Sequence, residues 1–266
     1  MPVILSARHV TKSFNAGGVV AVRDLSMEVE EGEFVCLLGA SGCGKSTMLS
    51  MFAGFLQPTS GHVMLRGQPI TGIEPRCGMV FQSYALFPWK TVRGNVEFGL
   101  KLQGVGRVER RVRAQGFIDL VKLTGFEQRY PTELSGGMQQ RVTLARILAA
   151  DPEVLLMDEP FAALDAMTRQ VMQEELLRIH ATSGKTTVFI THSIDEALIL
   201  SDRIVIMSAR PGRIKAVVPN TLPRPRHVSA QLSPEFTALK TQIWQLVETE
   251  MISQDEASRA APVASF

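Results

Sequence analysis

Short runs of apolar residues recur along the chain, and between them apolar residues repeat at helical spacing. Four runs, rich in Val, Ile, Leu and Phe, are nearly continuously apolar: EFVCLLG (33–39), EVLLMD (153–158), TTVFITH (186–192) and DRIVIMS (202–208). Strands that are buried on both faces of a parallel sheet have this pattern. The alternation of such strands with helical stretches predicts an α/β fold with a mostly parallel sheet.

Two stretches have the spacing of an amphipathic helix. Apolar residues recur three and four positions apart from Met138 to Ala149, and again in the range 166–180 at Met172, Leu176 and Ile179. Residues at this spacing lie on one face of a helix, so these side chains are expected to face a core.

The middle of the chain, roughly 91–150, has no clear strand pattern. We therefore predict a single domain in which a helical subdomain, about 83–150, is inserted into a sheet-containing core of about 1–82 and 151–215. A short C-terminal tail, 216–266, follows.

The chain changes character after Pro211, where NTLPRPRHVSAQLSPEF is punctuated by prolines. A helix is expected from about Phe236 to Met251, packed on the surface. Residues 252–266 are small and polar, and we expect them to be frayed.

Composition excludes several classes of protein. The net charge is +2, and the four arginines of RVERRVR (107–113) are interrupted by Val and Glu, which is typical of a solvated helix face, so no nucleic-acid partner is expected. Three cysteines without C-x-x-C spacing disfavour a disulfide framework or a zinc site. The chain has no run of eighteen consecutive apolar residues, so we expect no membrane-spanning helix.

The strongest chemical signal is GASGCGKST, 39–47, between a predicted strand and a helix start. In G-x-x-x-x-G-K-S the glycines let successive backbone N–H groups face inward and hold phosphate at a helix N-terminus. Lys45 is expected to reach the β and γ phosphates, and Ser46 to ligate Mg²⁺; the alternative is an ordinary glycine turn. The residues expected at the nucleotide are Gly39, Ala40, Ser41, Gly42, Cys43, Gly44, Lys45, Ser46 and Thr47.

The segment VLLMDEP (154–160) delivers two acids to the end of a strand. Ligands of open α/β folds bind at the carboxyl edge of the sheet. Asp158 is therefore a candidate for the Mg²⁺ shell, and Glu159 is a candidate to polarise an attacking water. Adjacent acids at such a place can also be a solvated helix cap.

The segment LSGGMQQR (134–141) has the paired glycines of an anion-binding turn but no lysine. Ser135 has the position of an N-cap, so the N–H groups of Gly136 and Gly137 can meet a phosphate at a helix N-terminus without a cation. The bland alternative is a simple capping turn.

Six motifs together resemble the ATP-binding cassette (ABC) proteins over about 3–215. They are the Walker A loop 39–47, Gln82 in VFQSYALFPW, LSGGMQQR, LLMDEP, FAALD ending at Asp165, and His192 in FITHS. The resemblance implies a P-loop NTPase fold of RecA type with an antiparallel β edge. It also implies a head-to-tail dimer of two copies, with ATP held between the Walker A loop of one and Ser135–Gly137 of the other.

The resemblance further implies residue roles. Glu159 is the general base, His192 contacts the γ-phosphate and aligns the water, and Asp165 crosses the dimer interface. Gln82 touches Mg²⁺ or the water and forms the hinge to the helical subdomain. The expected Mg²⁺ ligands are Ser46, Gln82 and Asp158; alone, His192 would more often be structural.

Two residues of the expected site have a second interpretation. Phe14 stands where cassettes place an aromatic ring that stacks on adenine, usually tyrosine, and a core phenylalanine is the alternative. Cys43 lies near a helix N-terminus and Lys45, which favours thiolate, so we expect inactivation by a thiol reagent and protection by MgATP. It can also merely fill space.

Partners and cargo are inferred from the apolar cluster Tyr84 to Trp89, which is either local core or a docking surface. The resemblance implies docking of a membrane permease there, with a periplasmic solute-binding protein as an indirect partner and a location on the cytoplasmic face of the bacterial inner membrane. LFPW, SARPGRI (208–214) and the tail resemble the nitrate, sulfonate and taurine importer branch. Alternatives are import of bicarbonate, an aromatic acid or a vitamin precursor, and a soluble ABC ATPase; an exporter and a P-loop kinase fit less well.

Overall fold

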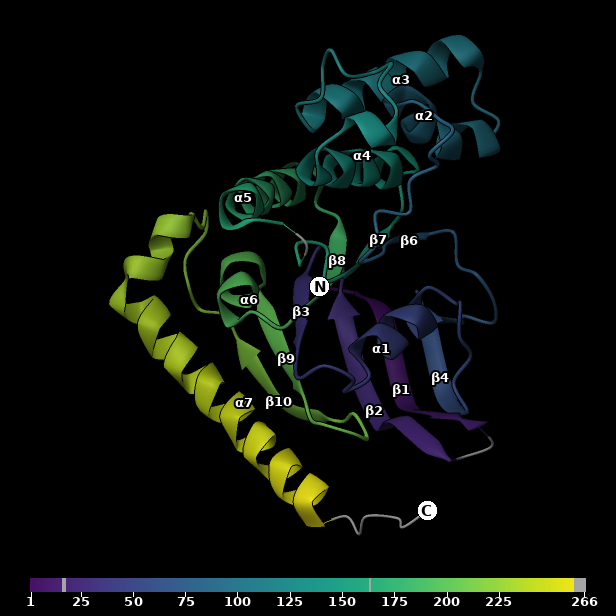
Figure 1. Cartoon of the computed structure of the whole chain (residues 1–266). Helices are drawn as coiled ribbons and strands as arrows, with labels where there is room; N and C mark the ends of the chain where they lie inside the picture. The colour runs from purple at the N-terminus through teal and green to yellow at the C-terminus, as the bar shows by residue number, and fades with distance from the viewer. Residues whose placement is uncertain (16–17, 163, 261–266) are drawn as a thin grey trace, which may run out of the picture. The chain divides into compact units, whose positions relative to one another are not determined.

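The computed structural model describes residues 1–15, 18–162 and 164–260, so Ala163 of FAALD and the last residues of the expected frayed tail lie outside the description. Contacts between Cα atoms divide the chain into two compact units. Unit 1 consists of Met1–Ile73 and the described residues from Val188 onward, and unit 2 is Glu74–Thr187. Figure 1 shows the elements of both units. The domain limits expected at 83 and 150 stay a prediction.

The elements of unit 1 are β1 Val3–Phe14, β2 Val19–Glu30, β3 Phe34–Leu38, α1 Lys45–Phe52, β4 Ser60–Leu65, β5 Gln68–Pro69, the end of β8 Thr186–Thr191, α6 Ile194–Leu200, β9 Arg203–Met207, β10 Ile214–Pro219, the 3₁₀ helix η3 Val228–Leu232 and α7 Pro234–Ala260. Those of unit 2 are β6 Cys77–Val80, α2 Val92–Leu102, α3 Arg107–Leu120, the 3₁₀ helix η2 Pro131–Glu133, α4 Gly136–Ala149, β7 Val154–Asp158 and α5 Ala166–Ser183.

One sheet of unit 1 is antiparallel, with the strand order β2-β1-β4-β5. Strands β1 and β2 pair along their whole lengths, from Val3 opposite Glu30 to Phe14 opposite Val19. Figure 1 shows β2, β1 and β4 lying side by side. The family resemblance implied an antiparallel β edge, and this sheet is antiparallel; the sequence pattern had not identified its strands.

The second sheet of unit 1 contains the strands β10-β9-β3-β8. Strands β3 and β9 are parallel, and every residue of β3 and β8 is buried, as their continuous apolar runs predicted. The rings of Phe34 and Phe189 lie 5.9 Å apart in this core. Because β3 and β8 are neighbours in this sheet, the segments that follow them begin at adjacent strands.

The C-terminal helix α7 is longer than predicted. It begins at Pro234 and continues to Ala260, whereas the expectation ended the helix at Met251 and left the following residues frayed. The expectation was wrong for 252–260 because ISQDEASRA contains neither glycine nor proline and its composition is compatible with a helix. Figure 1 shows α7 beside α6, which it contacts, and Phe236 and Ile243 of α7 are buried.

Unit 2 contains the helices that the middle of the sequence predicted. Helices α2, α3 and α4 pack on one another, and α4 buries Val142 and Ala145 completely. In α5 the predicted inward residues Met172, Leu176 and Ile179 are at most 1% exposed. The two strands of this unit, β6 and β7, are parallel.

A buried asparagine organises the loop before α2. Asn95 is 0% exposed, and its side chain accepts a hydrogen bond from the N–H of Phe87 at 2.9 Å. Its amide donates to the carbonyls of Phe87, Lys90 and Thr91 at 3.0 to 3.2 Å. One side chain thereby satisfies the polar backbone of a loop that makes no regular structure.

We predict that Asn95→Ala lowers the free energy of unfolding by about 2 to 4 kcal/mol, because it removes a fully buried amide and takes their side-chain partner from the N–H of Phe87 and the carbonyl of Lys90. Urea unfolding followed by circular dichroism measures this. Lys101→Ala, an exposed change on the same helix, should alter stability by less than about 0.5 kcal/mol. A loss below about 1 kcal/mol for Asn95→Ala would show that water replaces its hydrogen bonds.

Candidate functional site

The loop between β3 and α1 is closed on itself by its lysine. Lys45 is 5% exposed, and its Nζ atom donates to the carbonyls of Gly39 at 2.7 Å and of Ala40 at 2.9 Å. A buried ammonium group needs such partners because burial without them is costly. The amine therefore lies inside the loop, where an arriving phosphate can replace the two carbonyls.

Two glycines of this loop have backbone conformations that other residues avoid. Gly42 has φ of 75° and Gly44 has φ of 98°. A Cβ atom on Gly44 would lie 2.8 Å from the Ala21 carbonyl and from a methyl carbon of Val22. Glycine is required at Gly44 both for its conformation and for the close approach of β2.

The expectation of a thiolate at Cys43 is wrong. The side chain is 2% exposed, and burial raises the pKa of the Cys43 thiol from its ordinary value of 9.0, although Lys45 acts in the opposite direction. Desolvation of the charged form therefore outweighs the neighbouring cation. At neutral pH the thiol stays protonated, which favours the alternative that it fills space.

His192 lies in the turn that follows β8, and the next residue, Ser193, caps the helix α6. Ser193 accepts a hydrogen bond from the N–H of Glu196 at 3.3 Å, and the first turn of α6 carries Asp195 and Glu196. The hydroxyl of Thr191 donates to Glu196 at 2.5 Å and accepts from the N–H of Ser193 at 3.0 Å. These bonds fix the backbone on both sides of His192.

A cavity of about 460 Å³ brings the phosphate loop and His192 together in unit 1. Gly39, Ala40 and Ser41 line it with His192. The other lining residues are Leu38, Ile194, Asp195, Lys240, Trp244 and Val247. Both the residues that follow β3 and those that follow β8 thus contribute to one cavity, as expected for neighbouring strands.

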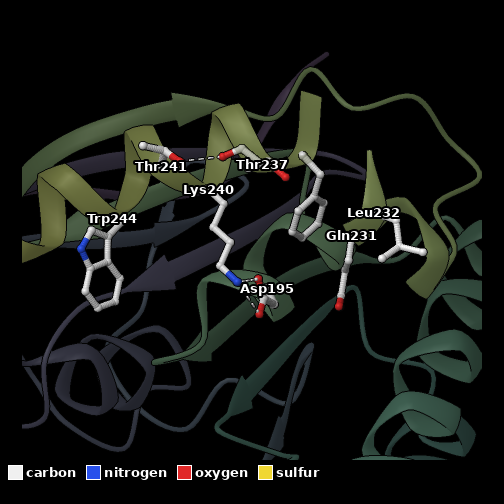
Figure 2. A pocket seen from close by; sticks show the side chains of 8 residues that line it. Asp195, Gln231, Leu232, Thr237, Lys240, Thr241 and Trp244 are labelled. Atoms are coloured by element: carbon white, nitrogen blue, oxygen red, sulfur yellow. Dashed lines mark hydrogen bonds and ion pairs between the residues drawn. The ribbon is translucent and has the colours of Figure 1, made fainter. Parts of the chain in front are cut away.

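Helix α7 contributes residues to this cavity that the sequence analysis missed. Lys240 pairs with Asp195 at 2.7 Å, and Trp244 lies one turn further along α7. Figure 2 shows this ion pair in the adjoining cavity, which has a volume of about 490 Å³. Lys240 and Trp244 are four residues apart on a predicted helix, so the sequence could have shown that they share one helix face.

Asp158 is the last residue of the strand β7 of unit 2, Glu159 follows it, and both are partly buried. Glu159 has φ of 44°, in the left-handed region that residues with a Cβ atom rarely adopt. Such a conformation costs on the order of 1 to 3 kcal/mol. Seven other described residues with a Cβ atom also have a positive φ, Asp24 and Asp151 among them, so the backbone conformation alone does not distinguish Glu159.

Ser135 caps α4 as predicted, with its hydroxyl accepting from the N–H of Met138 at 3.3 Å. The two following glycines also permit close packing. A Cβ atom on Gly136 would lie 2.9 Å from the Tyr84 hydroxyl, and one on Gly137 would lie 2.5 Å from a methyl carbon of Thr168. Ser135 and Gly136 are exposed, so the helix N-terminus is open to a ligand from outside.

Three further predicted residues have distinct settings. Asp165 caps α5, and the hydrogen bond from the N–H of Thr168 lowers the pKa of its carboxyl group. Gln82 is exposed in the loop after β6. Phe14 ends β1 with 37% of its surface exposed and the Lys12 ammonium 5.3 Å from its ring centre, so it is not a core residue.

The apolar cluster Tyr84 to Trp89 is divided between packing and exposure. The Phe87 ring lies 4.6 Å from that of Phe98, and the guanidinium of Arg146 lies 5.4 Å from it. Trp89, in contrast, is 71% exposed. Phe87 therefore anchors the loop locally, and Trp89 is presented to solvent.

The predicted site residues are thus distributed over both units. The phosphate loop, Phe14 and His192 belong to unit 1; Gln82, Ser135 to Gly137, Asp158, Glu159 and Asp165 belong to unit 2. The donors expected for Mg²⁺ are a hydroxyl, an amide and a carboxylate, which are oxygen ligands of the kind Mg²⁺ prefers. Within the described ranges no group of three His, Cys, Asp or Glu residues is arranged to hold a metal ion.

A search of the described helices found none that is both long and apolar enough to cross a membrane.

Comparison with known proteins identifies the family. The family model for ABC transporters matches residues 22–162. The nitrate import ATP-binding protein NrtD of Synechocystis sp. (strain ATCC 27184 / PCC 6803 / Kazusa) is 46% identical over 247 residues, which cover 91% of this chain and 93% of that protein. The taurine import ATP-binding protein TauB of Burkholderia pseudomallei (strain 1710b) is 55% identical over 200 residues, covering 75% and 77%.

Solved structures agree on the fold. A dimeric ATP-binding cassette in a post-hydrolysis state, bound to ADP and Pi, is 33% identical, with a TM-score of 0.72 over 82% of this chain and all of that one. The cbiO1 protein from Clostridium perfringens, part of the ABC transporter complex cbiONQ, is 25% identical, with a TM-score of 0.76 over 91% and 96%. The predicted P-loop NTPase fold is confirmed, and the chain belongs to the ABC transporter family as an ATP-binding subunit, an ATPase.

Proposed function

We propose that this ATPase energises the import of a small anion, of the nitrate, sulfonate or taurine kind, by dimerising around two ATP molecules. The observation that carries the proposal is the pair of phosphate-binding features within one chain. One is a loop with a buried lysine, and the other is an exposed helix N-terminus at Ser135 and Gly136 without a lysine. A second copy supplies the complementary feature to each loop.

Unit 1 binds the nucleotide through its phosphate loop. Lys45 exchanges the carbonyls of Gly39 and Ala40 for phosphate oxygens, and the first turn of α1 presents its N–H groups. Phe14 stacks on adenine with its exposed face. Ser46 of this unit, with Gln82 and Asp158 of unit 2, would hold Mg²⁺, which would offset the negative charge of the phosphates.

Unit 2 supplies the base. Glu159 accepts a proton from the water that attacks the γ-phosphorus, and His192 aligns that water and contacts the γ-phosphate. The bond between the γ-phosphorus and the bridging oxygen breaks, leaving ADP and inorganic phosphate. The position of Glu159 directly after the carboxyl end of β7 supports this role, because ligands of open α/β folds bind at that edge of the sheet.

The import assignment is supported by the relatives. NrtD and TauB are named for the import of nitrate and taurine, and cbiO1 is part of a transporter complex. We place the chain at the cytoplasmic face of the inner membrane, with the permease docked at Tyr84 to Trp89 and a periplasmic binding protein delivering the anion. Bicarbonate, an aromatic acid or a vitamin precursor is the alternative cargo.

We predict that Glu159→Gln retains ATP binding and loses turnover by about 10²- to 10⁴-fold, because it removes the proton acceptor and leaves the phosphate loop intact. Phosphate release and a fluorescent ATP analogue measure the two quantities. Glu174→Gln, an exposed change on α5, should leave both unchanged. Normal hydrolysis by Glu159→Gln would remove Glu159 from the mechanism.

Mixing two inactive variants tests the dimer. Lys45→Ala disables the phosphate loop, and Ser135→Arg blocks the helix N-terminus, so each alone should be inactive. An equimolar mixture should recover about a quarter of the activity, because half of the dimers are hybrids and each hybrid has one intact site. An active Ser135→Arg protein, or a mixture with no activity, would contradict the head-to-tail dimer.

Transport in proteoliposomes tests cargo and docking together. The subunit, reconstituted with its permease and binding protein, should hydrolyse ATP faster with taurine, an aliphatic sulfonate or nitrate than with bicarbonate or an aromatic acid. Trp89→Ala should reduce this stimulation at least about 5-fold, because exposed tryptophans are frequent anchors of interfaces. Leu102→Ala, equally exposed in the same unit, is the control; an identical effect of both changes would place docking elsewhere.

A further inference from the structure

The segment SARPGRI, 208–214, connects β9 to β10 and lies against the outside of the phosphate loop. The Gly212 N–H donates to the Ala21 carbonyl at 2.9 Å, and the Arg23 N–H donates to the Gly212 carbonyl at 3.0 Å. A Cβ atom on Gly212 would lie 2.0 Å from the Cys43 carbonyl oxygen. The connection is therefore in backbone contact with the loop through a position that admits only glycine.

Arg210 makes a side-chain contact with the loop from the same segment. Its Nε atom donates to the Gly42 carbonyl at 3.1 Å. The guanidinium lies across Gly42, where a Cβ atom would be 2.9 Å from Nη2 and 3.3 Å from Nε. Gly42 thus gives room to the arginine as well as adopting a positive φ.

The hydrogen bond from Arg210 holds the peptide group between Gly42 and Cys43. The carbonyl of Gly42 and the N–H of Cys43 belong to one planar peptide and point in opposite directions. With the carbonyl held by Arg210, the Cys43 N–H faces the inside of the loop, where it donates to the Ala40 carbonyl at 3.3 Å. Gly42 and Gly44, on either side of Cys43, place no side chain against this peptide, so the hydrogen bonds to Arg210 and to the Ala40 carbonyl are what hold it.

We propose that Arg210 is a positioning residue of the phosphate loop. It holds the Gly42 carbonyl outward and so keeps the Cys43 N–H turned toward the phosphates of the bound nucleotide. The inference rests on the proposed function, because it assigns a task in nucleotide binding to a residue that does not itself touch the nucleotide.

The chemistry of the side chain suggests the variants. In glutamine the amide nitrogen is separated from Cα by the same number of bonds as Nε is in arginine. Arg210→Gln therefore keeps a donor where Gly42 needs one and removes the charge, whereas Arg210→Met keeps the length and removes the donor. Arg213→Met removes another exposed arginine from the same connection and is the matched control.

We expect Arg210→Met to raise the dissociation constant for ATP and the KM for hydrolysis about 5-fold, with kcat changed less than about 2-fold, because one hydrogen bond to a charged donor at an exposed site is lost. Arg210→Gln should recover most of the affinity, and Arg213→Met should bind as the unsubstituted protein does. Melting temperatures of all three identify any loss that comes from unfolding. Competition with a fluorescent ATP analogue measures the dissociation constants.

Unchanged ATP binding by Arg210→Met would overturn the proposal, and so would an Arg210→Gln protein as weak as Arg210→Met, which would assign the effect to charge. The unsubstituted protein and Glu159→Gln, measured in the same assay, distinguish a failure of this inference from a failure of the proposed function. If they bind ATP and Arg210→Met binds equally well, this inference alone fails. If the unsubstituted protein does not bind ATP, the proposed function fails with it.

Discussion

The phosphate loop can take its shape only where one stretch of backbone passes another without a side chain between them. Gly44 approaches Ala21, and Gly212 approaches Cys43, at distances that no Cβ atom allows. These contacts fix the loop from outside before any ligand is present. Lys45, bound to the carbonyls of Gly39 and Ala40, fills the inside. Because both sides are held, the loop can exchange internal hydrogen bonds for phosphate at little cost in conformational entropy.

Local patterns in the sequence were sufficient for the core and the caps. Strands β3 and β8 are buried along their whole length, and their continuous runs of apolar residues predicted this burial. Ser135 and Ser193 cap helices in the structure because a hydroxyl before an apolar helical pattern satisfies free N–H groups within the same turn. Such interactions span only a few residues, so they can be predicted without knowledge of the fold.

Contacts between distant segments could not be predicted in this way. The ionisation of Cys43 was misjudged because the sequence shows its neighbour Lys45 and not the burial that outweighs it. The hydrogen bond from Arg210 to Gly42 joins residues that are 168 positions apart. The lining of the cavity by Lys240 and Trp244 likewise depends on where α7 packs. The roles of individual residues in hydrolysis were taken from the resemblance and stay predictions.

The two anion-binding features of the chain differ in charge for a physical reason. A site that uses both Lys45 and a second lysine would bind product phosphates nearly as strongly as ATP, since a full charge acts on every anion nearby. The helix N-terminus at Ser135 contributes only the partial charge of its N–H groups, and this effect falls off within the first turn. On the proposed function, this contact would therefore favour a γ-phosphate in place over one that has been released. A dimer that separates after each cycle, as proposed, would gain from a second contact that the backbone makes.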